Sequence, residues 1–137
     1  MTRDEIVKGV CKCIGEVVYT DPATIKEKDK IIEDLGADSL DLLDLIFRLE
    51  RHFKISISPG DIERKAKSKL GDVPLQINGI YTPKALEELR KALPEVPHAE
   101  LSEGLHMAKL PRTFRVATFV NIVSRIQAES SSEKAHG

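Results

Sequence analysis

The sequence predicts an all-α protein that forms a small helical bundle. Apolar residues recur at helical spacing in several segments, and the core must be mainly aliphatic, because the 137 residues include four Phe, two Tyr and no Trp. A chain of this length is expected to form one domain with a modest core. The scarcity of aromatic residues excludes the stacking platforms that bind single-stranded nucleic acid, so no nucleic-acid partner is expected.

The first predicted element is a helix from about Arg3 to Tyr19. Its apolar residues follow the 3.6-residue period: Ile6, Val7, Val10, Cys13, Ile14, Val17 and Val18. Asp21-Pro22 ends it, since the residue before a proline disfavours the helical conformation. A polar connection from Ala23 to Glu33 follows, and we expect its isoleucines to hold this loop against the bundle: Ile25, Ile31 and Ile32.

The second predicted helix runs from Ser39 to about Phe53. Asp38 is a suitable N-cap, and Asp41 can complete an aspartate version of the capping box. This places Ser39 in the first turn, beside unpaired backbone N–H groups and the positive end of the helix dipole. The helix has too many large apolar residues for one buried stripe, so some of them must face water or a partner.

The rest of the chain alternates between helices and turns. Ser58-Pro59-Gly60-Asp61 predicts a short helix over 61–67, and residues 71–80 are expected to form an extended loop rather than a regular strand. Thr82-Pro83 predicts a helix from Pro83 to Leu93, followed by a short helical turn over 99–105. The last helix is expected to include 113–123 and to pack through Val116, Ala117, Phe119, Val120 and Val123.

The near-zero net charge conceals an uneven distribution. Residues 31–50 hold six acidic residues and one arginine, whereas residues 51–70 hold six lysines or arginines and two acidic residues. An acidic helix repels phosphate backbones and suits docking to basic patches on partner proteins.

Neither a metal site nor a membrane segment is predicted. Cys11 and Cys13 lack a second pair that would complete a zinc site, and they are interpreted as small buried residues. No stretch is long and apolar enough to cross a bilayer, and the first residues lack the features of a secretory signal. A cytoplasmic location is therefore expected.

The segment from Ile32-Glu33-Asp34-Leu35 through Gly36-Ala37-Asp38-Ser39-Leu40-Asp41, with the acidic helix that follows, resembles the acyl carrier protein family. The resemblance extends through Pro59. It implies a four-helix bundle, no catalytic residues, and covalent attachment of phosphopantetheine to Ser39 beside Asp38. In such carriers the terminal thiol of the arm holds an acyl chain as a thioester, for fatty acid or more specialised lipid synthesis.

The resemblance also implies roles for other residues of the second helix. Partner-binding positions are Leu40, Asp41, Asp44, Phe47 and Glu50, and the candidates for the inner wall of an acyl pocket are Leu43, Ile46 and Leu49. The implied partners are a phosphopantetheinyl transferase and acyl-transferring, ligating or synthase enzymes with basic docking patches. We expect a monomer.

The chain departs from the family pattern in a long insertion of about residues 66–111 between the third and last helices. We expect it to form an extra lobe of a single carrier domain over residues 1–129, with a disordered tail over 130–137. The lobe could cover a long acyl chain, offer a second docking surface, or place Arg64, Lys65, Lys67 and Lys69 against acidic lipid head groups.

Two other functions remain open from the sequence. A peptidyl-type carrier would use the same serine to hold an amino acid, although the acidic second helix argues against it. The other function is that of a helical interaction module, which has the carrier fold but no arm. In that case, replacing Ser39 would leave every activity unchanged.

Overall fold

The computed structural model describes residues 1–58 and 60–136, with side chains described through residue 129, and it is mainly helical as predicted. The chain forms two compact units. The first, here called the bundle, combines Met1–Ile57 with the chain from Phe114 onward, and the second, here called the lobe, is Ser58–Thr113. The predicted insertion of about residues 66–111 lies within this second unit.

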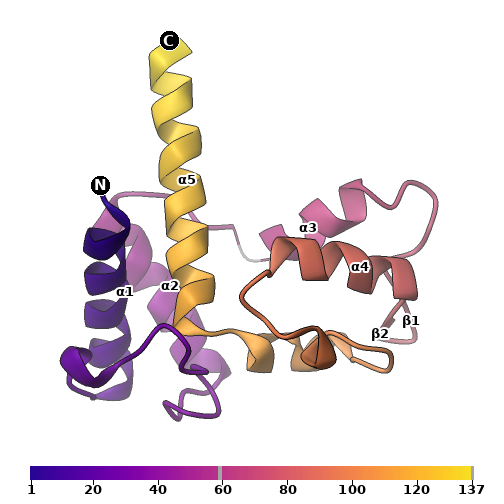
Figure 1. The fold of residues 1–137 in the computed structure, drawn as a ribbon, viewed down its shortest axis with the longest axis horizontal. Coiled ribbons are helices and arrows are strands. Elements are labelled where there is room, and N and C mark those ends of the chain that lie inside the picture. Colours follow the sequence, from indigo (N-terminus) through magenta and orange to yellow (C-terminus); the bar gives the residue numbers. More distant parts are fainter. Residues whose placement is uncertain (59, 137) are drawn as a thin grey trace. The chain divides into compact units, whose positions relative to one another are not determined.

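The bundle consists of α1 (Arg3–Val18), the 3₁₀ turn η1 (Pro22–Thr24), α2 (Ser39–Phe53) and α5 (Val116–His136). Helix α1 packs against both α2 and α5, and Figure 1 shows the three lying side by side. Their inner faces form an almost wholly aliphatic core, as the composition predicted. Its most deeply buried members are Ile6, Val10, Ile14, Leu45, Leu49, Val116, Val120 and Val123.

Close approach of α1 and α2 depends on Gly9, in the middle of α1. A β-carbon at this position would lie 2.5 Å from Cζ of Phe53 and 2.9 Å from Nε2 of His52. The glycine costs some helix propensity, because it adds backbone freedom to the unfolded chain. In the folded protein, however, the absence of a side chain at Gly9 leaves room for the buried ring of Phe53.

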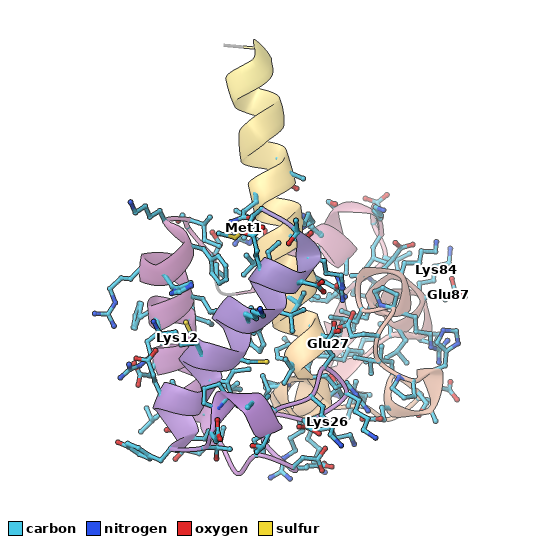
Figure 2. All side chains as sticks on the ribbon, turned by 60° about the vertical axis from the view of Figure 1, so that its left-hand side comes forward. Met1, Lys12, Lys26, Glu27, Lys84 and Glu87 are labelled. Atoms are coloured by element: carbon cyan, nitrogen blue, oxygen red, sulfur yellow. The ribbon has the colours of Figure 1, made fainter. Side chains whose placement is uncertain are left out.

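The long connection between α1 and α2 is held to the bundle as expected. Ile25 and Ile31 are buried, and Ile32 packs partly against the core. The connection also caps α5: the amide of Val116 donates to the carbonyl of Asp29 at 3.0 Å, and the amide of Ala117 donates to that of Glu27 at 2.9 Å. The side chain of Glu27 forms an ion pair with Arg3 at 2.7 Å, and Figure 2 labels Glu27 beside Lys26 in this loop.

Both cysteines are buried in the bundle and have free thiols. Burial raises the pKa of Cys11, and it raises the pKa of Cys13 from 9.0 to about 11. Neither thiol is therefore suited to nucleophilic chemistry in the folded protein.

This burial predicts that both cysteines react with a thiol reagent at pH 8 only after unfolding. Because the pKa of Cys13 is higher in the folded protein, the contribution of its neutral thiol to stability is complete below pH 9 and declines between pH 9 and about 11. Spectrophotometric thiol titration with and without denaturant checks this. Rapid labelling of the native protein would contradict it.

The lobe contains α3 (Asp61–Ser68), the two short strands β1 (Gln76–Ile77) and β2 (Ile80–Tyr81), and α4 (Pro83–Ala92), followed by the 3₁₀ segments η2 (His98–Glu100) and η3 (Met107–Thr113). Helices α3 and α4 pack together within this unit (Figure 1). The inner face of α4 is apolar, whereas Lys84 and Glu87 lie on its exposed side (Figure 2). The lobe core includes Ala85, Leu86, Leu89, Leu93, Val96 and Leu101.

The predicted α4 is confirmed, and its N-cap is Thr82, whose hydroxyl accepts from the amide of Ala85 at 3.3 Å. The helix over 61–67 is also confirmed as α3. The helical turn over 99–105 is shorter and earlier than predicted, as η2, while η3 was not predicted.

The expectation of a loop without strands over 71–80 was wrong, because β1 and β2 form an antiparallel hairpin with Gln76 opposite Tyr81 and Ile77 opposite Ile80. Its two turn residues, Asn78 and Gly79, have φ of 54° and 84°. Positive φ at both positions is the geometry of a type I′ turn, which Asn-Gly favours.

The backbone of α5 continues as helix to His136, where a disordered tail was expected. The side chains of residues 130–136 and the whole of Gly137 lie outside the described part of the chain. The predicted disorder of 130–137 therefore stays a prediction.

Candidate functional site

The start of α2 is fixed by a capping box. Oδ1 of Asp38 accepts from the amide of Asp41 at 2.8 Å, and Oδ2 of Asp41 accepts from the amide of Asp38 at 3.0 Å. Asp38 itself is extended, with φ of −110° and ψ of −174°, and the helix begins at Ser39. The predicted cap, capping box and helix bounds are all confirmed. Two reciprocal hydrogen bonds thus fix the position of Ser39 relative to the helix axis.

Ser39 is exposed at the first position of α2. Among the described residues, its hydroxyl makes no hydrogen bond. The first amides of a helix lack intrahelical acceptors and lie at the positive end of the dipole, which favours an attached phosphate. This position suits a residue that another protein modifies, and phosphopantetheine fits it, because the group attaches to a hydroxyl through a phosphodiester.

Beyond Ser39, α2 carries a stripe of exposed apolar side chains. The exposed fractions are 76% for Leu40, 44% for Leu43 and 52% for Phe47. Spacings of three and four residues place them along one side of the helix. Leu40 and Phe47, which were predicted to bind partners, are thus exposed. The predicted inner-wall position of Leu43 must be corrected, because its side chain lies outside the core.

The buried side of α2 is made of other residues. Leu49, predicted for the inner wall, is fully buried, and Ile46 is half-buried against the core. Leu42 and Leu45, which were not predicted for this side, are buried with them. The helical spacing of Leu42, Leu45, Leu49 and Phe53 could have identified this face.

The predicted acidic residues differ in their surroundings. The carboxylate of Asp44 accepts from Arg48 Nε at 3.2 Å, and Arg48 also forms an ion pair with Glu16 at 3.2 Å. Oε2 of Glu50 accepts from the amide of Ile57 at 2.9 Å, which holds the chain just after α2. Glu50 therefore has a structural role in addition to any role in docking.

A shallow depression lies at the carboxyl-terminal end of the exposed stripe. It is lined by Asp44, Phe47, Glu50 and Arg51. Arg51 was not predicted to belong to the site. Its position four residues after Phe47 is the only sequence signal that could have placed it there.

Among the described side chains, no cluster of three or more His, Cys, Asp or Glu residues is arranged to bind a metal ion. No helix in the described part of the chain combines the length and apolar character needed for a membrane span.

Comparisons with known proteins agree with this geometry. Residues 8–68 match the family model described as "Phosphopantetheine attachment site". The matched range includes α2 and α3. An acyl carrier protein of Thermotoga maritima is 39% identical over 72 residues, which are 53% of this chain and 86% of that protein. One from Campylobacter lari is 42% identical over 62 residues, 45% of this chain and 80% of its own length.

A third relative, an acyl carrier protein of Wolinella succinogenes, is 38% identical over 68 residues, which are 50% of this chain and 87% of that protein. The relatives are thus matched over most of their own length, while about half of the present chain has no counterpart in the alignments. The chain belongs to the acyl carrier protein family, whose members carry a covalently attached phosphopantetheine group and are carriers rather than enzymes.

Proposed function

We propose that Ser39 is the attachment residue for phosphopantetheine and that the protein presents an acyl chain to enzymes of fatty acid or specialised lipid synthesis. The observation that carries the proposal is the exposed, unbonded hydroxyl of Ser39 at the first position of α2. A phosphopantetheinyl transferase supplies the base that removes its proton, so the carrier needs no catalytic residue of its own.

The residues around Ser39 have distinct effects on the attached group. The amino-terminal amides of α2 stabilise the phosphate, whereas the carboxylates of Asp38 and Asp41 repel it. Because the two carboxylates also hydrogen-bond each other's backbone amides, part of their charge is compensated locally. Leu40 is the most exposed apolar side chain beside the attachment point, and it offers a contact to an enzyme that approaches the arm.

The arm supplies a terminal thiol that holds the acyl group as a thioester. The aliphatic side chains of the bundle offer shelter for such a chain, with Ile46 and Leu49 on the inner side of α2. Each buried methylene gains about 0.8 kcal/mol, so a long aliphatic chain gains more than a short one. This preference favours fatty acyl groups over amino acids and hence a lipid pathway.

The expected partners are the transferase and acyl-transferring, ligating or synthase enzymes. The acidic groups near Ser39 suit their basic docking patches. A monomeric state and a cytoplasmic location remain predictions.

The proposal predicts that the arm attaches at Ser39. The full chain is incubated with coenzyme A and a promiscuous phosphopantetheinyl transferase, digested, and mapped by tandem mass spectrometry. The modified peptide should contain Ser39, and fragmentation should place the added group on that residue. An arm on another exposed serine, such as Ser58, would overturn the assignment. Absence of any arm would favour an interaction module with the carrier fold.

The chemical class of the cargo needs a separate measurement. Acyl groups released by mild base from protein purified from its source organism should be aliphatic carboxylic acids, which mass spectrometry identifies. Release of an amino acid, together with loading by an adenylating enzyme, would instead indicate a peptidyl-type carrier.

A further inference from the structure

The depression at the carboxyl-terminal end of the α2 stripe combines an exposed aromatic ring with a cation. Phe47 is 52% exposed and lines the depression together with Arg51. The two residues are four positions apart, so their side chains lie one turn from each other on the same side of the helix. An exposed aromatic side chain in a hollow is a typical contact point for a partner.

The charges around this ring are not equally available. Asp44 is paired with Arg48, and Glu50 is hydrogen-bonded to the amide of Ile57. Arg51 is exposed, and among the described residues its guanidinium makes neither an ion pair nor a hydrogen bond. The Arg48 ion pair offsets the charge of Asp44, and the amide of Ile57 holds Glu50 in place without removing its charge. Arg51 is therefore the cation that this lining presents beside the exposed ring of Phe47.

The other end of the stripe has the opposite character. Asp38 and Asp41 flank Ser39 there, and Arg51 lies twelve positions after Ser39, a rise of about 18 Å along the helix. The exposed face of α2 is thus negative at its beginning and presents a free cation near its end. A partner that carries basic groups alone complements only the first half of this face.

We propose that the depression is a docking site for a segment of a partner enzyme that places an apolar side chain on Phe47 and a carboxylate on Arg51. The inference rests on the proposed carrier function, because it concerns the enzymes that the arm would visit. It distinguishes partners by charge: an enzyme with an acidic group opposite Arg51 binds favourably, and one with a basic group there is repelled.

Two short amphipathic peptides test the proposal. Both peptides have leucines at the same helical spacing, which form a stripe along one side. They differ only at the edge of that stripe, where one peptide carries glutamate and the other carries lysine. Each is titrated into the ¹⁵N-labelled full chain, with and without the arm. The glutamate peptide should shift the amide resonances of Phe47, Glu50 and Arg51, and added salt should weaken its binding.

Substitutions supply the decisive comparison. Arg51→Glu should weaken binding of the glutamate peptide by about fivefold or more and strengthen binding of the lysine peptide, and Arg51→Gln should lie between the two. Lys26→Glu makes the same charge change at an exposed residue of the bundle outside the depression, and it should leave both affinities unchanged. Because Arg51 is exposed, the variants should keep the amide spectrum of the folded parent.

Three results would overturn the inference. Equal binding of the glutamate peptide to the parent and to Arg51→Glu would remove Arg51 from the site, and shifts confined to residues near Ser39 would remove the depression. Shifts that depend on protein concentration without peptide, and vanish in Arg51→Glu, would show that a second copy of the chain occupies the depression. Peptide docking is measured without the arm as well, so its failure is distinct from a failure of arm attachment at Ser39.

Discussion

Replacing Ser39 with alanine is expected to abolish attachment of the phosphopantetheine arm completely. The arm is joined through the serine oxygen, and a methyl group offers no atom that can form the bond to phosphorus. The fold should be unaffected, because Ser39 is exposed, its hydroxyl makes no hydrogen bond in the described structure, and Asp38 supplies the cap. A change in the free energy of unfolding within about 0.5 kcal/mol is expected.

Intact-mass measurement after incubation with coenzyme A and transferase reads the result directly, and a thermal melt followed by circular dichroism reads the fold. Ser56→Ala is the matched control, because it removes an exposed serine hydroxyl from the same unit and should still gain the arm. A mass gain on Ser39→Ala would refute the assignment. Loss of the arm together with unfolding would instead attribute the effect to a disrupted helix start, at Asp38 and the capping box, and not to the missing hydroxyl.

Replacing Leu49 with alanine is expected to lower the free energy of unfolding of the bundle by about 3 kcal/mol. Leu49 is fully buried in the core that α1, α2 and α5 share. Its truncation removes apolar contacts and leaves a cavity that the surrounding helices fill only in part. Urea unfolding of the full chain, followed by far-ultraviolet circular dichroism, measures the change.

Leu40→Ala is the control for this prediction, since it deletes the same atoms from a side chain that is 76% exposed on the same helix. It should change the unfolding free energy by no more than about 0.5 kcal/mol. Similar losses for the two variants would mean that helix propensity, rather than burial, determines the effect. That outcome would contradict the placement of Leu49 on the inner side of α2.

Features set by neighbouring residues were predictable from the sequence. The bounds of α2 agree with the prediction at both ends, because Asp38 and Asp41 define its start within four residues. The beginning of α4 follows from Thr82-Pro83 in the same way. In both cases the hydrogen bonds that begin the helix join residues close in sequence, so short motifs contain the necessary information.

Other features depended on which of two plausible signals prevailed. Asn78-Gly79 is a strong hairpin signal, yet the surrounding turn-forming residues favoured a loop. Backbone hydrogen bonds to a later segment decided in favour of the hairpin. The amide of Tyr81 donates to the carbonyl of Leu105, and the amide of Met107 donates to that of Gly79. On α2, apolar residues are so frequent that the sequence does not fix which side of the helix faces the core. Turning the helix about its axis by one residue exchanges Leu42 for Leu43 on the inner side.

The grouping of elements into units could not be predicted locally. Helix α3 was recognised, but its packing with α4 in the lobe depends on contacts between distant parts of the sequence. Arg51 was overlooked for a related reason. A charged residue near the end of a helix is common, and only the structure reveals that it shares a depression with Phe47.

The order of the two units along the chain has a consequence for biosynthesis. The bundle is assembled from two stretches that the lobe separates, and α5, which supplies Val116, Val120 and Val123 to the core, leaves the ribosome after the lobe. The lobe is one continuous stretch, so it can fold while α1 and α2 still lack their third neighbour. Messages that end within the lobe would yield chains with Ser39 present but with the inner faces of α1 and α2 uncovered, a state that chaperones and proteases recognise. Completion of the bundle therefore depends on a segment that is translated after the lobe.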